Sequence, residues 1–322
     1  TFPYTTLFRS IQKIPILWKS HKLALLLRPQ AFESFDLSEY DLVISSSSAE
    51  SKWVITKPGT LHICYCHTPT RYFWSHYHEY LTMMEFGVLN PLGKWLMPKF
   101  VHKLRQWDFI AAQRPDYFIA NSQNTSRRIE KYYNRESTVI YPCLDIQKIP
   151  FSDQKENYYF YTGRCIPYKK FDLLIETFNQ NGKKLKIATN TDTKLYKYLK
   201  SISKPNIEWI YTSDLYVINT LHSKARAFLF PPEEDFWLAP IAAQATGTPV
   251  IAYGKWGALE TVITEKTGLF FSEQTVDSLN RAIENFEKMS FDYKAIREHA
   301  EKFSKSQFER QLIDFIADKM YN

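Results

Sequence analysis

Short apolar runs alternate along the chain with segments whose apolar positions repeat at helical spacing. Ten of these runs are continuously apolar instead of alternating with polar positions, which is typical of parallel strands buried on both faces of a sheet. Helical patterns separate or follow them at residues 171–179, 276–289 and 306–320. The predicted strands cover residues 42–46, 61–67, 117–121, 138–141, 158–163, 185–189, 207–211, 227–231, 249–253 and 268–271.

This alternation over the whole length predicts doubly wound α/β domains. The chain has 322 residues, which is enough for about two domains of roughly 150 residues each. The polar segment 142–157, which contains Pro150, is the predicted linker. We therefore expect a first Rossmann-like domain at 11–148, a second at 149–304 and a C-terminal helix at 305–322.

The first ten residues, TFPYTTLFRS, fit none of these patterns. After Thr1 they match a translation of a common sequencing-adapter oligonucleotide, so we expect residues 1–10 to be a non-native artefact. On this interpretation the native N-terminus is lost and the first domain is incomplete.

Composition limits the class of protein. Hydrophobic residues make up 44% of the chain and charged residues 23%, close to the globular average, which excludes wholesale disorder. No apolar run reaches the roughly 18 residues that a membrane span needs. The four cysteines show no C-x-x-C spacing, and such sparse usage fits a reducing compartment. We expect a soluble, cytoplasmic protein.

The net charge is +7, and residues 1–145 carry +5 of it. No Lys/Arg run is longer than two residues and no zinc-finger or RNA-recognition signature is present, so we expect no nucleic-acid partner. The segment 90–108 mixes apolar and basic side chains. It could rest as an amphipathic helix on an anionic membrane at the inner face, or pack as an ordinary half-buried helix. Pro98 is expected to interrupt any single long helix there.

The segment 158–178 reads as a strand, a turn opened by Gly163 and a helix. Such a junction directs backbone N–H groups at whatever lies beyond the carboxyl end of the strand. Arg164 and Lys169 fall on the turn, and two cations beside a helix N-terminus suit a diphosphate. A solvated basic turn is the alternative.

The segment 227–262 reads as a strand, an acidic loop, a short helix and another strand. Glu233, Glu234 and Asp235 lie just beyond the strand, where open α/β sheets bind ligands. Carboxylates there could accept hydrogen bonds from sugar hydroxyl groups. They could equally serve as an acidic N-cap for the helix that follows.

His67 ends the predicted strand 61–67 and is a candidate acid, base or hydrogen-bond donor to a substrate. No D-x-D pair with metal-ligand spacing stands out in the sequence, so we expect no catalytic metal.

Together these segments resemble the retaining glycosyltransferases of family 4, and are especially similar to bacterial surface-polysaccharide mannosyltransferases. The resemblance covers about residues 10–322. It rests on ESFDLSEYDLVISSS, HICYCHTPTRY, DYFIANSQNTSRRI, STVIYP, GRCIPYKKFDLLIE and FLFPPEEDF, which follow one another in family order. It implies the GT-B architecture, with two Rossmann-like domains facing across a cleft and a last helix that crosses back to the first domain.

The resemblance also implies roles for individual residues. Arg164 and Lys169 would stabilise the diphosphate leaving group, and developing charge there is where preorganised cations act. Glu234 would contact the donor sugar, and His67 would lie near the transferred sugar. The remaining implied donor-binding positions are Gly163, Asp235, Phe236, Trp237, Leu238 and Ala242.

Several positions depart from the family pattern. Ala242 stands where the family has a second glutamate, and the N-terminal glycine-rich loop is missing. Tryptophan stands at glycine positions at Trp53, Trp237 and Trp256, and the chain has only 9 glycines. We hypothesise that UGA codons read as glycine in the native lineage were translated as tryptophan. An indole at Trp237 or Trp256 would fill donor space.

The resulting expectation is a hexosyltransferase that moves a mannose-like sugar with retention from a nucleoside-diphosphate sugar, GDP-mannose being favoured, without metal or cofactor. The expected acceptor is lipid-linked or a polysaccharide. The alternative is a non-catalytic nucleotide-sugar-binding remnant or an inactive gene fragment.

Overall fold

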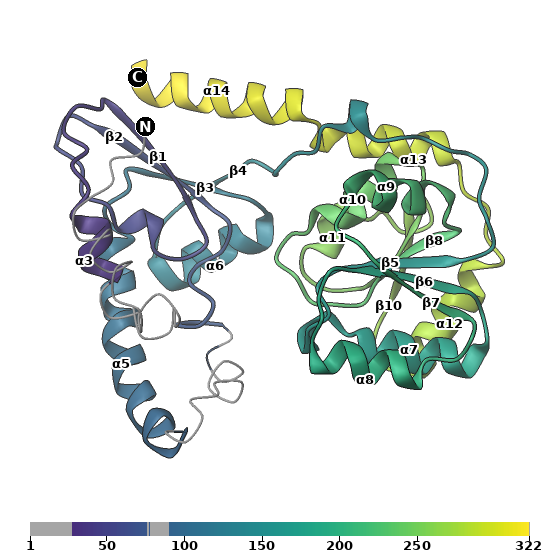
Figure 1. Ribbon diagram of the computed structural model, residues 1–322. Helices are drawn as coiled ribbons and strands as arrows, with labels where there is room; N and C mark the ends of the chain where they lie inside the picture. The colour runs from purple at the N-terminus through teal and green to yellow at the C-terminus, as the bar shows by residue number, and fades with distance from the viewer. Residues whose placement is uncertain (1–27, 76, 78–89, 322) are drawn as a thin grey trace. The chain divides into compact units, whose positions relative to one another are not determined.

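The structure is a computed structural model that describes residues 28–75, 77 and 90–321, with the backbone alone for residues 90–97. The predicted artefact at 1–10 lies outside the described residues. The chain divides into two compact units. One unit comprises the chain up to Ile140 together with the C-terminal residues from Phe315 onward, and the other comprises Tyr141–Asp314 (Figure 1).

Among the residues that the structure describes, the first unit is built on a four-stranded parallel sheet of order β1-β2-β3-β4. Its central strands are buried, and Ile63 on β2 and Ile119 on β3 have no exposed surface. Helix α6 begins where the Ser122 side chain accepts a hydrogen bond from the Thr125 N–H, an N-cap that fixes the end of the preceding turn. The elements are α3 (Arg28–Glu33), β1 (Leu42–Ser47), η2 (Ser51–Trp53), β2 (Leu61–Cys66), α5 (Asn90–Ala111), β3 (Tyr117–Ala120), α6 (Gln123–Tyr133) and β4 (Thr138–Val139).

Helix α5 contradicts the prediction that Pro98 interrupts the segment 90–108. The helix runs unbroken from Asn90 to Ala111 with Pro98 inside it. A proline removes one helical hydrogen bond and strains the preceding turn. Val101 and Leu104 bury their side chains on the next turns, and this packing offsets the cost.

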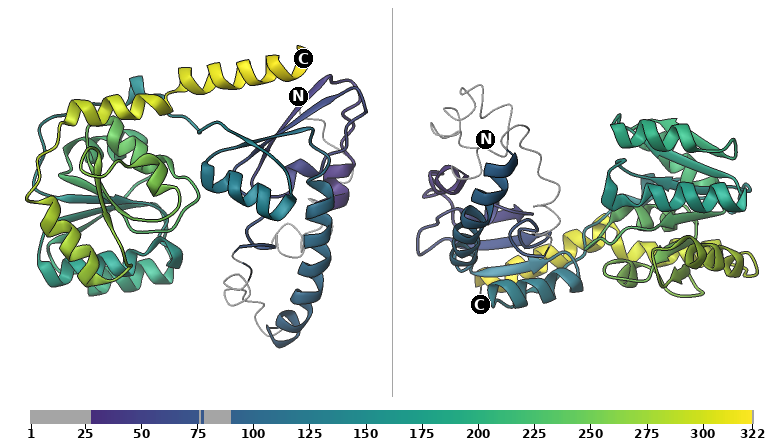
Figure 2. Two further views of the ribbon diagram at one scale, coloured as in Figure 1. Left: turned by 180° about the vertical axis from the view of Figure 1, so that it is seen from behind. Right: turned by 90° about the horizontal axis from the view of Figure 1, so that it is seen from below.

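The second unit contains a six-stranded parallel sheet of order β10-β9-β8-β5-β6-β7. Read from β7, this is the Rossmann order, in which the direction of winding reverses between β5 and β8. Helices α7 and α8 cover one face, and α9, α10 and α13 cover the other (Figures 1 and 2). The strands are β5 (Tyr159–Thr162), β6 (Leu185–Thr189), β7 (Ile207–Tyr211), β8 (Ala227–Phe230), β9 (Val250–Tyr253) and β10 (Gly268–Phe271). The helices are η5 (Pro167–Lys169), α7 (Phe171–Asn181), α8 (Lys194–Ile202), α9 (Leu215–Lys224), α10 (Leu238–Ala245), α11 (Ala258–Thr261), α12 (Val276–Phe286), α13 (Tyr293–Ala300) and η6 (Glu301–Phe303).

All ten predicted strands are present, with ends that differ by at most two residues, and every pairing between them is parallel. The predicted α/β fold is therefore confirmed. Continuous apolar runs identified these strands because both faces of each sheet are covered.

The predicted linker is partly ordered by the second unit. Ile146, in η4 (Ile146–Lys148), and Ile149 pack against Ile241 and Phe303. The Arg297 guanidinium donates hydrogen bonds to the carbonyl oxygens of both, at 3.1 Å to Ile146 and 3.0 Å to Ile149. Consequently the compact units separate between Ile140 and Tyr141 and not at 148.

Helix α14 (Lys305–Tyr321) is continuous, yet the division between the units falls inside it, after Asp314. Phe315 packs edge-on against Tyr117 of β3, with ring centroids 6.2 Å apart. The C-terminal residues therefore pack with the first unit. Within the ranges that the structure describes, no helix is long and apolar enough to cross a membrane.

Candidate functional site

The best-formed group of predicted site residues lies beyond the carboxyl ends of β5 and β8. These neighbouring strands flank the point where the strand order reverses, which is where open α/β sheets bind ligands. The turn after β5 carries Gly163 and Lys169, and the loop after β8 carries Glu234 and Trp237. The topology thus brings two sequence segments that are about seventy residues apart to one sheet edge.

Lys169 and Glu234 form a buried ion pair. The Lys169 Nζ atom lies 2.6 Å from Glu234 Oε1, and the side chains are 7% and 9% exposed. The Lys169 backbone is fixed by Tyr161, whose hydroxyl donates to the Lys169 carbonyl at 2.8 Å. Because removing one partner from a buried pair leaves an uncompensated charge, each side chain depends on the other or on a ligand of the same charge.

The Trp237 indole covers this pair. Lys169 Nζ lies 3.5 Å from the centroid of the ring, a close cation–π contact. The indole packs on Phe230, with ring centroids 5.1 Å apart, and a Cβ atom added at Gly163 would lie 3.2 Å from Trp237 Cη2. The indole therefore fills the space between the Gly163 turn and the lysine.

The other predicted donor-binding residues have different surroundings. Arg164 is exposed, and in the described part of the chain its side chain makes no hydrogen bond or ion pair. Phe236 instead stacks on Tyr141, with centroids 5.5 Å apart, and Leu238 packs into the same cluster. Asp235 is buried, and its carbonyl faces the loop after β9.

The loop after β9 packs tightly on the β8 loop. The Gly257 N–H donates to the Glu234 carbonyl at 3.0 Å, and a Cβ atom at Gly257 would lie only 2.3 Å from the Asp235 carbonyl oxygen. Only glycine fits there. The preceding residue, Trp256, has a φ of 58°, a left-handed conformation that is unfavourable for a bulky side chain and natural for glycine. This backbone supports the hypothesis of a native glycine at 256.

Two further positions depart from the family pattern, Trp53 and Ala242. Trp53 is fully buried, and its Nε1 donates to Asp108 at 3.1 Å, so the surrounding core accommodates the indole. Ala242 is half-buried on α10. Two residues on, the Gln244 amide donates to the Thr261 carbonyl at 2.8 Å and is therefore engaged elsewhere.

His67 lies at the carboxyl end of β2 in the first unit. Its Nε2 is 2.8 Å from Ser46 Oγ, and its backbone N–H donates to the Ser47 carbonyl at 2.8 Å. Burial lowers the pKa of His67 below its ordinary value, which favours the neutral imidazole at pH 7. A neutral imidazole can donate a hydrogen bond from one nitrogen and accept one at the other.

Residues on α6 complete this strand-end group, and sequence reasoning missed them. The Thr125 hydroxyl donates to the His67 carbonyl at 3.2 Å, and Arg128 donates to Thr68 Oγ1 at 3.2 Å. Arg128 is buried although it is charged. The signal available in the sequence was the capping serine, Ser122, which starts a helix directly after a buried strand. Over the described ranges, no three His, Cys, Asp or Glu side chains are grouped as metal ligands.

The sequence profile of the family described as "Glycosyl transferases group 1" matches residues 144–306, half of the chain. This stretch includes Gly163, Lys169, Glu234 and Trp237. The chain belongs to this family. Two curated glycosyltransferases are similar at low identity. The alpha-1,3/1,6-mannosyltransferase ALG2 of Saccharomyces cerevisiae is 22% identical, over 60% of this chain and 48% of ALG2. The O-antigen chain mannosyltransferase RfbU of Salmonella typhimurium is 24% identical, over 56% of this chain and 53% of RfbU. The chain thus spans about half the length of each relative.

Solved glycosyltransferase structures share the fold. Sucrose-phosphate synthase from Thermosynechococcus elongatus superposes with a TM-score of 0.70 at 17% identity, over 93% of this chain and 79% of that one. Anabaena HepE in complex with UDP-glucose gives 0.59 at 16% identity, over 80% and 78%. The galactosyltransferase WaaB gives 0.62 at 13% identity, over 94% and 82%. The predicted GT-B glycosyltransferase fold is confirmed.

Proposed function

We propose that this glycosyltransferase moves a hexose, mannose or a mannose-like sugar, from a nucleoside-diphosphate sugar to a lipid-linked or polysaccharide acceptor, with retention of configuration. The observation that carries the proposal is the buried Lys169–Glu234 pair at the switch point of the Rossmann sheet, inside the stretch that matches the family.

The chemistry of the pair suits a nucleotide sugar. During transfer the bond from the anomeric carbon to the diphosphate breaks, and negative charge develops on the leaving group. A buried ammonium such as Lys169 stabilises that charge more than an exposed one would, because the local dielectric is low. Glu234, 2.6 Å away, would accept hydrogen bonds from sugar hydroxyls on the same side. The exposed Arg164 would reach the diphosphate only once the donor is bound.

The names of the curated relatives support mannose as the transferred sugar, and the ligands in the solved structures support a nucleoside-diphosphate sugar as the donor. ALG2 and RfbU are both named mannosyltransferases, which supports a mannosyl donor, and we favour GDP-mannose. HepE was solved with UDP and with UDP-glucose, which supports a nucleoside-diphosphate sugar in general. We propose that the reaction needs no cofactor and no metal.

The described outer face of α5 supports a peripheral location on an anionic membrane at its cytoplasmic side. Lys99, His102 and Lys103 are exposed there, and Phe109 and Ile110 are exposed toward the end of the helix, at 40% and 55%. Basic side chains beside exposed apolar ones fit the surface of an anionic leaflet, where lipid-linked acceptors reside.

A second candidate function is supported by Trp237. Its ring lies on Lys169 at 3.5 Å, where a diphosphate would have to bind, so the chain with tryptophan at 237 could be a non-catalytic remnant. Titration of GDP, UDP, GDP-mannose and UDP-glucose into the chain and into the Trp237→Gly variant distinguishes the two. We expect binding and donor hydrolysis in the variant. Failure of the variant to bind any of the four compounds would reject the transferase proposal.

A further inference from the structure

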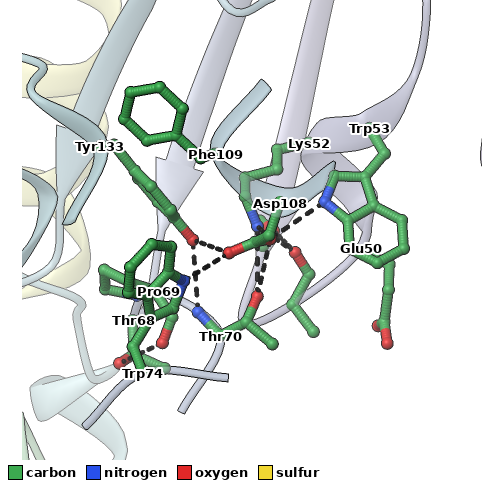
Figure 3. Close-up of polar contacts among 12 residues, drawn as sticks. Glu50, Lys52, Trp53, Thr68, Pro69, Thr70, Trp74, Asp108, Phe109 and Tyr133 are labelled. Atoms are coloured by element: carbon green, nitrogen blue, oxygen red, sulfur yellow. Dashed lines mark hydrogen bonds and ion pairs between the residues drawn. The ribbon is translucent and has the colours of Figure 1, made fainter. Parts of the chain in front are cut away.

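One carboxylate in the first unit is completely buried and lies outside the site described above. Asp108, on α5, has no exposed surface, and four side chains donate hydrogen bonds to it while a fifth, Lys52, forms an ion pair with it (Figure 3). Its Oδ1 atom accepts from Trp53 Nε1 at 3.1 Å and Thr70 Oγ1 at 3.0 Å, and pairs with the Lys52 ammonium at 2.7 Å. Its Oδ2 atom accepts from Trp74 Nε1 and the Tyr133 hydroxyl, both at 2.8 Å.

These donors come from separate parts of the chain. Lys52 and Trp53 belong to the segment after β1, and Thr70 and Trp74 belong to the segment after β2. Tyr133 ends α6, and its hydroxyl also accepts a hydrogen bond from the Thr70 N–H at 3.3 Å. One carboxylate therefore ties together the segments that leave the carboxyl ends of two neighbouring strands.

The segment after β2 is the one that begins at His67. Its start is held by the Ser46 hydroxyl and by the hydrogen bond from Arg128 to Thr68. Its far end is held by Asp108 through Thr70 and Trp74. We infer that Asp108 is a positioning residue that holds the loop 67–74 in place. Through this loop it fixes the position of His67 on the side of the reaction where the acceptor would bind. The acceptor-side role rests on the proposed function, whereas the positioning of the loop does not.

The network requires a carboxylate and not merely a polar side chain. Four partners donate hydrogen bonds to Asp108 and the fifth is the Lys52 ammonium, which is itself only 1% exposed. An asparagine would turn its NH₂ group either toward Trp74 and Tyr133 or toward the three groups at the Oδ1 position, and in both orientations the Lys52 ammonium would lose its counter-charge. Asp108→Asn should therefore release the loop even though its shape is nearly unchanged.

The test compares Asp108→Asn with Val101→Ala by NMR of tryptophan- and histidine-labelled protein. Val101 is buried on the same helix and packs in the cluster with Trp53 and Phe73, so Val101→Ala loosens the packing but leaves every hydrogen bond to Asp108. In Asp108→Asn we expect hydrogen exchange at the Trp74 indole N–H to accelerate about tenfold or more, the scale of one lost hydrogen bond. We also expect the pKa of His67 to rise toward its ordinary value as the loop opens to water. Val101→Ala should lower Tm without either change.

If Asp108→Asn fails to fold, Thr70→Val removes a single donor and carries the same comparison. Unchanged indole exchange and an unchanged His67 titration, or equal changes in Val101→Ala, would overturn the inference. Titration of GDP and UDP into the same variants, each combined with Trp237→Gly to open the proposed nucleotide site, keeps the two proposals apart, because that site lies in the second unit. Loss of loop order with nucleotide affinity intact supports the inference, whereas absence of nucleotide binding in every form bears only on the proposed function.

Discussion

Lys169 Nζ lies between two groups, 2.6 Å from Glu234 Oε1 and 3.5 Å from the centre of the Trp237 ring. The ammonium is thus neutralised on one side and covered on the other. In the proposed site, a diphosphate on Lys169 would have to displace the indole, so we expect the residue at 237 to decide whether the buried cation is available to a donor.

The left-handed backbone at Trp256 gives a stability prediction. Alanine and glycine at 256 both remove the indole, but only glycine tolerates a φ of 58° without a steric cost. We expect Trp256→Gly to be more stable than Trp256→Ala by about 1 kcal/mol. Urea unfolding of the two variants measures the difference. If alanine is as stable as glycine, the left-handed conformation at 256 is wrong.

A carboxylate at 242 should strengthen nucleotide binding. In the proposed site a glutamate on α10 would accept hydrogen bonds from the ribose hydroxyls, and we expect Ala242→Glu to raise the affinity for GDP or UDP about tenfold in a Trp237→Gly background. Gln244→Ala is the control, because that amide is bonded to the Thr261 carbonyl. It should reduce stability and leave affinity unchanged. A gain of less than twofold from Ala242→Glu would mean that the ribose is held elsewhere.

His62 predicts how stability depends on pH. Burial is the main cause that lowers the pKa of His62 from 6.5 to about 4 in the folded protein. Between these values the unfolded chain binds a proton that the folded chain does not, so stability is complete above pH 6.5 and falls as the pH is lowered toward 4. The total loss is about 3 kcal/mol.

Urea unfolding at pH 7, 5.5 and 4.5 measures this loss. The His62→Gln variant should show a flatter dependence, and His102→Gln, at an exposed position on α5, should match the parent. Parallel curves for the parent and His62→Gln would assign the acid sensitivity to other groups.

The sequence predicted the strands better than the segments between them. Parallel strands covered on both faces leave a continuous apolar signature, and all ten were found. The segment 142–157 appeared to be a linker because it is polar, but Ile146 and Ile149 bury their side chains on the second unit. Two apolar residues in a polar segment carry too little periodicity to show this.

The residues of the candidate site were likewise predicted only in part. Lys169 and Glu234 were each predicted to follow a strand, and the family resemblance assigned both to the donor; the structure pairs them. Asp108 has no such signal. Its partners are spread from Lys52 to Tyr133, and only the folded chain shows that they meet at one carboxylate.

The exposed face of α5 predicts selective binding to anionic vesicles. Reversing the charge of Lys99 and Lys103 together should weaken sedimentation with phosphatidylserine-containing liposomes, by about 1 kcal/mol for each lysine removed. Lys197→Glu combined with Lys224→Glu, at exposed positions of the second unit, is the control for net charge. Equal losses in both double variants, or equal binding to neutral and anionic vesicles, would reject a specific role for α5.

The proposal that Lys169 holds the diphosphate of the donor is tested most directly by calorimetric titration of GDP and UDP. Three variants are compared: Trp237→Gly, Trp237→Gly/Lys169→Ala and Trp237→Gly/Lys169→Ala/Glu234→Gln. The third avoids an unpaired buried carboxylate at 234. Trp237→Gly/Lys183→Ala is the matched control, because Lys183 pairs with Glu287 at 2.8 Å, away from the site. We predict that the opened protein binds nucleotide and that both Lys169 variants lose about 1.5–3 kcal/mol of binding free energy, the scale of a hydrogen bond to a charged group, while the Lys183 variant does not. Equal affinity with and without Lys169 would contradict the proposal.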